Sequence, residues 1–549
     1  MKKFLTLLLA LLMITTVLAG CGGTGGTQPD AGGESKAPGE SKPQTTADAG
    51  AMTEAPEATT KTDLIVTSYS DPKNLNPFQM EGRQAQRVNF QIFERLIDQG
   101  AEAGTFDGMI AESWEFDEDG LGITLKIREG VKFHNGDDLT LEDVRYSLEY
   151  AGTQPSSTSG FDWIKFTEAE IIEDSHSIYI PFGYECSLTL SALASNNIYI
   201  INKAVFEEYG DEVGQHPVGT GSFRIASPGD WVLDSSLKLT RFDEYWGTKP
   251  ILETINFKFI TENSQAMIEL ETGSADLVLD VPALSYAAME SNPEFQLIYA
   301  NPVVGDYVHF NCSRAPFDDV RVRQAVAYAM NQADIRKAVY LDQADILFSA
   351  VTPVIFGYSD QFEGDKWPYE YDNANIEKAK ELLTEAGYPN GLDVEFVIDD
   401  SSDRIAVAEV VKNQLEAAGI RTNLSSMDYA AWNQRLLNGE IDMFLNGINA
   451  QTGEPDRAMF LRWHSSCIPD GTNMTQFSNA EFDEVMSAAR KTYDDAEKIE
   501  LYKEAQRIWV EQSPSIPYIT RNHIYAAKAN LKGLRSYGEA CKLSGIYFE

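Results

Sequence analysis

Histidine is scarce in this chain, and its placement excludes several kinds of catalytic or metal site. The sequence of 549 residues has 6 histidines, and no two of them have the H-x-x-x-H spacing that binds zinc from one helix face. It also lacks a C-x-x-C pair, a G-x-S-x-G nucleophile elbow and a phosphate loop that ends in Gly-Lys-Ser or Gly-Lys-Thr. No G-x-G-x-x-G follows a strand pattern, which argues against a dinucleotide fold. We therefore expect no enzymatic activity, with no catalytic residues, no metal and no cofactor.

Cysteine is also rare, with 5 residues in the whole chain. Cys21 belongs to the N-terminal segment, which leaves Cys186, Cys312, Cys467 and Cys541. These four residues allow three disulfide pairings, and the sequence favours none of them. Buried free thiols are an equal alternative, because a chain of this length buries a core that does not depend on disulfides.

Basic residues are outnumbered by acidic ones. The chain has 44 lysines and arginines against 84 aspartates and glutamates, which gives a net charge of -40. Such a charge repels phosphate backbones and anionic lipid heads, so nucleic acid is excluded as a partner. We interpret the acidity as a solvated surface. Hydrophobic residues still make up 43% of the chain, and its length predicts two or more lobes with sizeable cores.

Long hydrophobic runs are absent from the chain after its N-terminal segment. No later segment has the ~20 apolar residues of a membrane-spanning helix. The N-terminus has two lysines before a short apolar run, which predicts a signal peptide over residues 1–20. The run ends in LAGC, which is similar to a bacterial lipobox and implies acylation of Cys21 as a membrane anchor. The alternative is an ordinary cleavage site with a chance cysteine. Residues 21–62 are poor in large apolar side chains and are expected to form a disordered tether.

The most informative stretch is residues 110–149. Alternating Ile123, Leu125 and Ile127 predict a half-buried strand, and Thr140 with Asp143 predicts a capping box at the start of a helix. The sequence of this stretch resembles the signature of bacterial extracellular solute-binding proteins of family 5, the oligopeptide and dipeptide family that delivers ligands to ABC importers. The stretch contributes AESW at 111–114, TLKIREGVKFHNG at 124–136 and EDV at 142–144; further matches are HPVGTGSFR at 216–224, YW at 245–246, YVHFN at 307–311, APFDDVRVRQAVAYA at 315–329 and SPSIPY at 513–518.

The resemblance runs from about residue 63 to 535 and implies the fold. We expect an α/β, two-lobed periplasmic-binding-protein-like fold (type II, cluster C) with an extra inserted subdomain. The implied division assigns residues 63–97, 168–302 and 519–549 to lobe I, residues 98–167 to the inserted subdomain and residues 303–518 to lobe II. The signature at 110–149 is expected to identify the family rather than to touch a ligand.

Local patterns predict several further elements. An opening strand is expected at 63–67, a helix ending in residues 91–97, and strands at 177–181 and 198–201. Gly219 and Gly221 are expected to supply a tight turn with positive φ. Helices are expected after the Pro-Phe-Asp turn at 316–318, at 379–388 with a glycine stop, and at 407–419 before a strand at 420–424.

The ligand site is implied by the family. In relatives, residues at the positions of Glu81, Gly82 and Arg83 line the cleft, and a surface salt bridge is the alternative role of Arg83. Tyr429 and Trp432 are candidate aromatic walls, with core packing as the alternative.

The substrate-determining segment is expected at residues 447–455. Relatives have Gly-Trp-x-x-Asp-Tyr-x-x-Pro there, and their aspartate pairs with the α-ammonium of the ligand. In this chain Ile448 replaces the tryptophan, Gln451 the aspartate and Thr452 the tyrosine. A buried ammonium without a counter-charge is costly, so either Glu454 or Asp456 supplies the anion from a shifted register, or the ligand has no free amine.

The implied function is an extracytoplasmic lipoprotein that captures a small solute and delivers it to ABC permease subunits. Peptide is the leading ligand, with oligosaccharide and then nickel or a metallophore as alternatives. A peptide-sensing or chaperone receptor without transport is an alternative of another class. We expect a monomer that meets the bacterial cell membrane through its lipid anchor. The enzyme hypothesis would be revived by a histidine, an acid and a nucleophile within hydrogen-bond reach in one pocket.

Overall fold

The computed structural model describes residues 61–79, 82–100, 105–154, 160–300, 302–450, 453–468, 472–537 and 540–549. The predicted signal peptide, most of the predicted tether and Cys21 lie outside these residues. Among the described residues, no helix combines the length and the apolar character needed to cross a membrane.

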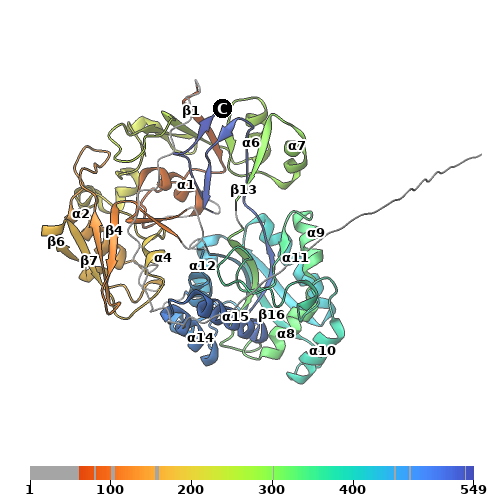
Figure 1. The fold of residues 1–549 in the computed structure, drawn as a ribbon. Helices are drawn as coiled ribbons and strands as arrows, with labels where there is room; N and C mark the ends of the chain where they lie inside the picture. The colour runs from red at the N-terminus through yellow and green to blue at the C-terminus, as the bar shows by residue number, and fades with distance from the viewer. Residues whose placement is uncertain are drawn as a thin grey trace, which may run out of the picture. The chain divides into compact units, whose positions relative to one another are not determined.

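An eight-stranded sheet combines strands from the beginning, middle and end of the described chain (Figure 1). Its order is β13-β20-β12-β1-β11-β10-β8, and β9 pairs with β10. The predicted opening strand is confirmed as β1, which runs parallel to both β11 and β12. The strands are β1 (Asp63–Ser68), β8 (Phe223–Arg224), β9 (Trp231–Val232), β10 (Ser236–Arg241), β11 (Thr254–Phe259), β12 (Leu277–Val278), β13 (Phe295–Tyr299) and β20 (Ile524–Lys528).

A separate four-stranded antiparallel sheet contains the family signature. Its order is β4-β5-β7-β6, with β4 (Ala111–Phe116), β5 (Gly122–Ile127), β6 (Glu170–Ile172) and β7 (Ser177–Pro181). The predicted alternation is confirmed, because Ile123, Leu125 and Ile127 of β5 are all buried. Helix α2 (Leu141–Gly152) begins at the predicted capping box, and Figure 1 shows it beside β6 and β7. This sheet continues to Pro181, beyond the boundary expected at residue 167.

A six-stranded mixed sheet forms the core of the remaining chain. Its order is β15-β19-β14-β18-β16-β17, and β14 pairs with both β18 and β19. Helices surround it, including α8 (Val320–Ala329), α10 (Ile376–Glu385), α11 (Ser402–Ala417) and α15 (Asp495–Gln512) (Figure 1). The strands are β14 (Val304–Phe310), β15 (Asp345–Ile346), β16 (Leu392–Asp399), β17 (Ile420–Met427), β18 (Met443–Asn449) and β19 (Ser515–Thr520).

The other elements are mainly helices. The expected helices after residue 318, at 379–388 and at 407–419 correspond to α8, α10 and α11, and Gly387 and Gly419 have positive φ as glycine stops require. The helices are α1 (Gly82–Ile92), α4 (Thr189–Leu193), α5 (Lys203–Tyr209), α6 (Asn263–Glu271), α7 (Tyr286–Ser291), α8 (Val320–Ala329), α9 (Gln332–Tyr340), α10 (Ile376–Glu385), α11 (Ser402–Ala417), α12 (Tyr429–Leu437), α13 (Pro455–Trp463), α14 (Ala480–Lys491) and α15 (Asp495–Gln512); short strand pairs are β2 (Ile97–Gln99) with β3 (Phe106–Gly108), β21 (Leu531–Lys532) with β24 (Tyr547–Phe548), and β22 (Arg535–Tyr537) with β23 (Ala540–Lys542).

The chain passes between the eight-stranded and six-stranded sheets twice. The first passage joins β13 to β14 over residues 299–304, and the second joins β19 to β20 over residues 520–524. We call the part built on the eight-stranded sheet lobe I and the part built on the six-stranded sheet lobe II. Each has its own buried hydrophobic cluster, and a third cluster lies under the four-stranded sheet.

Two predicted elements were wrong. Helix α1 ends at Ile92, and Ile97 begins strand β2 instead of belonging to the helix. Residues 198–201 are buried, but they form no strand because their amides have other partners: Ile200 N–H donates to the Glu94 carbonyl at 2.8 Å and Ile201 N–H to Ser147 Oγ at 2.9 Å. Residues 198–201 are therefore apolar because they are buried, not because they pair with another strand.

The predicted positive φ of Gly219 and Gly221 was also wrong, since neither residue is in that region. Both are glycine because the chain passes directly over the end of α1. A Cβ on Gly219 would lie 2.1 Å from the Ile92 carbonyl oxygen, and one on Gly221 would lie 2.5 Å from the Gln91 carbonyl oxygen. The two glycines therefore let the backbone of this motif pass close to the carbonyl groups at the end of α1.

The signature motifs meet at one buried carboxylate in lobe I. Glu94 accepts hydrogen bonds from Thr220 Oγ1 at 2.9 Å, from Tyr245 Oη at 2.7 Å and from Trp246 Nε1 at 2.7 Å. Burial raises the pKa of Glu94, and these three donors oppose that change. The PVGTG-like and Tyr-Trp motifs are thus joined structurally although they are distant in sequence.

The four described cysteines are free thiols. Cys186, Cys467 and Cys541 are buried and Cys312 is half-buried. Burial raises the pKa of Cys186 and Cys541 to about 12, so both stay protonated at neutral pH. Of the two alternatives left by the sequence, the structure shows the free thiols.

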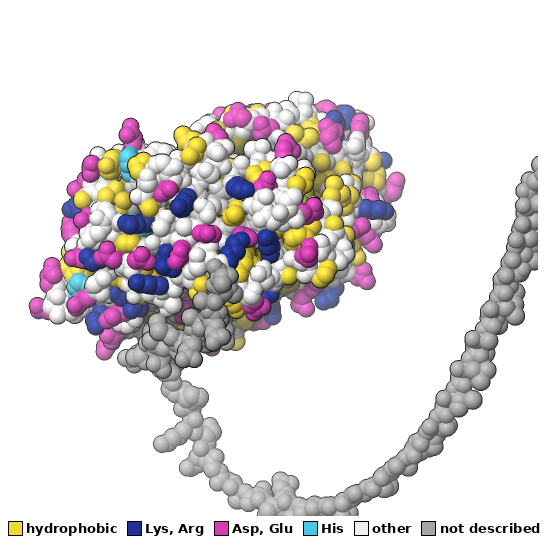
Figure 2. Space-filling model, turned by 90° about the horizontal axis from the view of Figure 1, so that it is seen from above, with side chains coloured by type: hydrophobic (Ala, Val, Ile, Leu, Met, Phe, Trp, Pro, Cys, Tyr) yellow, Lys and Arg dark blue, Asp and Glu magenta, His cyan; other side chains and the backbone are white. Residues whose placement is uncertain are grey.

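The surface has the mixed character expected of a solvated acidic protein. Figure 2 shows Asp and Glu side chains spread over the visible face and interspersed with Lys and Arg. Many of these charges are paired, for example Arg145 with Glu142 and Glu149 along α2. Such exposed pairs each contribute ~0.2–1 kcal/mol to the stability of the fold, and they do not indicate a binding site.

Candidate ligand-binding cleft

A cavity of about 700 Å³ lies at the junction of the two lobes. This volume is within the ~300–1,000 Å³ typical of small-molecule sites. Both chain passages border it, through Val303 and Val304 at the first and Arg521 to Ile524 at the second. Lobe I also contributes α1 and the segment after β12, and lobe II contributes β14, α9, α11 and β18.

The lobe I wall is organised around Asp280, which follows β12. Arg83 approaches Asp280 Oδ1 at 3.3 Å, and the buried Arg87 donates to both carboxylate oxygens at 2.7 and 3.0 Å. Burial alone would raise the pKa of Asp280, but the Arg87 charge and hydrogen bonds outweigh burial and hold it below the usual range. The carboxylate therefore stays ionised and positions Arg83 at the cavity.

The lobe II wall carries two more arginine and aspartate pairs. Arg404, near the start of α11, is paired with Asp399 and donates to Asn446 Oδ1 at 3.2 Å. Arg521 lies 3.1 Å from Asp403. Asp306 of β14 also lines the cavity. Three cationic and three anionic side chains thus face one space: Arg83, Arg404 and Arg521 with Asp280, Asp306 and Asp403.

An unsatisfied acceptor lies on the same wall. Asn449, the last residue of β18, lines the cavity, and its buried Oδ1 has no hydrogen-bond partner among the residues that the structure describes. A buried amide oxygen without a partner is costly, so Asn449 Oδ1 would gain from any donor that reaches it. Gly447 also lines the cavity, and a Cβ there would lie 3.0 Å from Asp306 Oδ1.

The predicted site residues fall into different places. Arg83 lines the cavity, and Gly82 is the first residue of α1. Ile448 is buried on β18 between the two cavity residues Gly447 and Asn449. Glu81 and Gln451 lie outside the described residues.

The two aromatic candidates lie off the cavity. Trp432 is fully buried, donates through Nε1 to the Val397 carbonyl at 3.2 Å and packs with Phe444, which favours the core-packing alternative. Tyr429 is 60% exposed on the first turn of α12. Neither side chain lines the cavity, and their role in binding stays a prediction.

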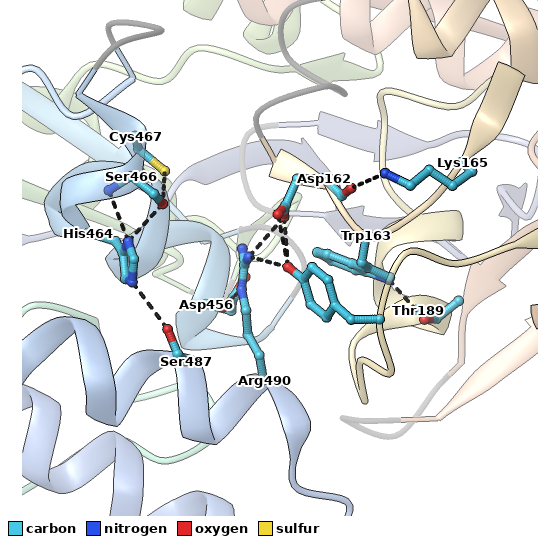
Figure 3. Close-up of polar contacts among 11 residues, drawn as sticks. Asp162, Trp163, Lys165, Thr189, Asp456, His464, Ser466, Cys467, Ser487 and Arg490 are labelled. Atoms are coloured by element: carbon cyan, nitrogen blue, oxygen red, sulfur yellow. Dashed lines mark hydrogen bonds and ion pairs between the residues drawn. The ribbon is translucent and has the colours of Figure 1, made fainter. Parts of the chain in front are cut away.

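Glu454 and Asp456 differ in what surrounds them. Asp456 accepts two hydrogen bonds from Arg490, at 2.7 and 3.0 Å, so its charge is already compensated (Figure 3). Glu454 Oε2 is buried without a partner among the described residues, and burial raises the pKa of Glu454 to about 7 against the attraction of Lys498. Of the two predicted anions, only Glu454 lacks a counter-ion in contact among the side chains that the structure describes.

A histidine, an acid and serines do come together at α13 and α14, away from the cavity. His464 Nδ1 accepts from the Ser466 backbone N–H at 3.1 Å and lies 2.8 Å from Ser466 Oγ, and Ser487 Oγ lies 3.2 Å from His464 Nε2 (Figure 3). Asp483 accepts from Ser465 N–H and Oγ at 3.0 and 2.6 Å. This geometry is a helix cap, since His464 bonds the backbone of the residue two positions later.

Sequence reasoning missed most of the charged cavity residues. Asp280, Asp306, Arg404 and Arg521 come from four separate segments of an acidic chain, where single charged residues carry little information. One usable signal existed for Asp280, because it directly follows the carboxyl end of a parallel strand, where α/β proteins place their ligands.

Two α/β lobes, two chain passages and a polar cavity at their junction define a bilobal solute-binding protein. The chain belongs to the bacterial extracellular solute-binding proteins, family 5, whose middle-region model matches residues 105–470. Its fold is the expected two-lobed type II periplasmic-binding-protein fold.

Individual relatives agree with this assignment. The glutathione-binding protein GsiB of Shigella dysenteriae serotype 1 is 30% identical over 480 residues, which cover 86% of this chain and 91% of GsiB. The Helicobacter pylori periplasmic binding protein DppA, solved with the peptide STSA, is 23% identical with a TM-score of 0.78 over 89% of this chain and 98% of DppA. MoaA of A. tumefaciens R10, solved with mannopinic acid, is 27% identical with a TM-score of 0.76 over 89% of this chain and all of MoaA.

Proposed function

We propose that this protein is the extracytoplasmic receptor of an ABC importer and that its ligand is a short peptide carrying both charges. The observation that carries the proposal is the cavity wall, where arginine and aspartate side chains from both lobes line one space together with Asn449, whose Oδ1 has no partner among the described residues. A peptide offers a carboxylate for an arginine, an ammonium for an aspartate and N–H groups for an amide oxygen. No other ligand class among the alternatives supplies all three.

Capture would follow from the two-lobed architecture. A ligand in the cavity touches Arg83 and Asp280 of lobe I together with Asp306, Arg404 and others of lobe II only when the lobes are closed. Its binding free energy therefore favours the closed form, which is the form that a permease can distinguish from the empty receptor. The relatives named for glutathione and for the peptide STSA support a peptide ligand.

The proposal includes the ligand contacts predicted from the sequence and chooses between the two predicted carboxyl groups. Glu81, Gly82, Arg83, Ile448 and Gln451 are proposed to lie against the ligand, since Arg83 and both neighbours of Ile448 line the cavity. For the ligand ammonium, Glu454 is favoured over Asp456, because Arg490 already compensates Asp456.

Oligosaccharide is the second ligand class. Tyr286 and Tyr340 line the cavity and offer aromatic faces, which is the observation in its favour. Against it, a neutral sugar leaves the charge of three arginines and three aspartates unused. A nickel complex has less support, because the cavity lining contains one histidine, His523.

The lobe and anchor assignments complete the proposal. Residues 63–97, 182–302 and 519–549 are assigned to lobe I and residues 303–518 to lobe II. The inserted subdomain is extended from residue 167 to Pro181 because β6 and β7 pair into its sheet. Cys21 is the proposed acylation site, and residues 21–62 the tether of a monomeric, lipid-anchored receptor. Labelling cells with radioactive palmitate tests the anchor: label is expected in the wild-type protein and absent from Cys21→Ser.

Ligand identity is tested on protein purified without refolding. Native mass spectrometry identifies any molecule that copurifies, and thermal-shift assays then compare glutathione, peptides of two to five residues, and oligosaccharides. Stabilisation by one or more peptides, followed by calorimetric measurement of Kd, is the expected result. A response to saccharides together with no response to any peptide would overturn the peptide proposal. Uptake of the bound peptide, lost on deleting the receptor gene, separates import from a sensing or chaperone role.

A further inference from the structure

Arg490 connects two parts of the chain that have separate hydrophobic cores. It lies near the end of α14, whose Met486 and Ala489 are buried in the lobe II core. Its partners on the other side come from the segment that follows the four-stranded sheet and from the loop before the short helix η1 (Phe166–Glu168). Trp163 of that loop belongs to the core under the sheet. Hydrogen bonds of His134 to Gly219 and Gly221 attach this sheet region to lobe I.

The contacts across this junction are polar and well aligned. One Nη of Arg490 donates to Asp162 Oδ1 at 3.1 Å and to Tyr184 Oη at 3.4 Å, while its Nε and other Nη bind Asp456 (Figure 3). The Arg490 carbonyl accepts hydrogen bonds from Ser187 N–H at 2.9 Å and Oγ at 3.2 Å. Side chain and backbone of one residue are thus both engaged by the opposite region.

Aromatic rings enclose the guanidinium from both sides. The Cζ atom of Arg490 lies 3.2 Å from the ring centroid of Phe460 in its own lobe and 5.2 Å from that of Trp163 across the junction. The side chain of Arg490 is 2% exposed, whereas that of Asp162 is 49% exposed. Removing a partner from a buried guanidinium is costly, but a half-exposed carboxylate returns to water easily.

This asymmetry suits a contact that opens and closes. When the lobes separate, Asp456 stays with Arg490 and keeps its charge compensated, while Asp162 and Tyr184 become hydrated. Asp456 also lies seven residues after Asn449, so one segment carries both a cavity residue and the anchor of Arg490. The junction is therefore separable without leaving an unpaired buried charge.

We propose that Arg490, held by Asp456, is a latch that fastens the region of Asp162 and Tyr184 to lobe II and stabilises the closed arrangement of the lobes. The latch sets how much of the protein is closed, independently of any contact with ligand. It goes beyond the proposed peptide-binding function and applies to whatever solute the cavity takes.

The test measures lobe separation without ligand. Nitroxide labels on Glu170→Cys of β6 and Glu484→Cys of α14, both exposed positions, report the distance across the junction by double electron–electron resonance in the purified full chain. Without ligand, the wild-type protein that carries only the two labels is expected to give two populations, a short-distance one with the junction closed and a longer-distance one with it open. Asp162→Ala is expected to raise the population of longer distances about threefold to fivefold, in line with the strength of a half-exposed ion pair. Tyr184→Phe is expected to act in the same direction with a smaller effect.

Asp174→Ala is the matched control, since Asp174 is an exposed aspartate of the same region that lies between β6 and β7. It is expected to leave the distance distribution unchanged, and thermal unfolding confirms that each variant is folded. Distributions for Asp162→Ala and Tyr184→Phe that match the labelled wild-type protein would overturn the latch, as would the absence of any short-distance population in the labelled wild-type protein. Because no ligand enters the measurement, this result does not depend on whether the ligand is a peptide.

Discussion

Replacing Glu454 with glutamine tests whether one buried carboxyl makes stability depend on pH. Burial raises the pKa of Glu454 from 4.5 to about 7 in the folded protein, against an attraction from Lys498. Its Oε2 has no hydrogen-bond partner among the described residues, so nothing there favours the charged form through a hydrogen bond. An ionised Glu454 is therefore a cost that the folded state carries at neutral and alkaline pH.

The direction in which the free energy of unfolding changes with pH follows from proton binding by Glu454 in the folded and unfolded states. Between about pH 4.5 and pH 7 the folded protein retains the proton of Glu454 and the unfolded chain releases it, so the free energy of unfolding falls as the pH rises. The contribution is fully present below about pH 4.5 and lost above about pH 7. The difference between the two pKa values corresponds to about 3 kcal/mol. Glutamine does not titrate, so Glu454→Gln removes this dependence.

Urea unfolding of wild type and variant from about pH 5 to about pH 8 measures the effect. The stability of Glu454→Gln relative to wild type is expected to increase by about 2 to 3 kcal/mol over that interval. Glu500→Gln is the matched control, because Glu500 is an exposed glutamate of α15 and its replacement should leave the wild-type pH dependence unchanged. Parallel curves for wild type and Glu454→Gln would refute the reasoning, since Glu454 would then titrate alike in both states.

Three further predictions concern the motif glycines and the cavity. Gly219→Ala is expected to lower the free energy of unfolding by at least about 2 kcal/mol because its Cβ meets a backbone carbonyl, whereas Gly229→Ala, at an open position, should change it by less than about 0.5 kcal/mol; urea unfolding checks both. If Gln451 occupies the ammonium site, Gln451→Asp is expected to raise calorimetric affinity for free-amine peptides; no gain, with binding lost in Glu454→Gln, would indicate the shifted register. Arg521→Ala is expected to weaken binding of the peptide found in the thermal-shift assays at least about tenfold by calorimetry, and an unchanged Kd would remove Arg521 from the site.

Local sequence predicted the elements whose causes are local. The capping box at Thr140 and Asp143 satisfies helix amides within one turn, and the alternation at Ile123 to Ile127 reflects one buried face of a strand. Both were confirmed because neither depends on distant residues. The order of the motifs then implied the family and its two-lobed fold, which the comparison with known proteins confirmed.

The failures have causes that lie far apart in the chain. Residues 198–201 have the composition of a strand, yet their amides bind Glu94 and Ser147, so tertiary partners decide against a ladder. Gly219 is required by the carbonyl of Ile92, which no local pattern around residue 219 reveals. Pairs such as Arg490 with Asp162 are separated by 328 residues, and in a chain with 84 acidic residues no single aspartate indicates its partner.

Pairing with aspartates explains how three arginines line the cavity of a strongly acidic protein. A net charge of -40 creates a surface that disfavours anionic solutes, yet the cavity contains Arg83, Arg404 and Arg521. Each of these arginines is held beside an aspartate, so the wall is nearly neutral as a whole and strongly polar at each point. A wall of that kind discriminates by the spacing of opposite charges on the ligand rather than by its net charge. It therefore suits a zwitterion better than a ligand with charge of one sign.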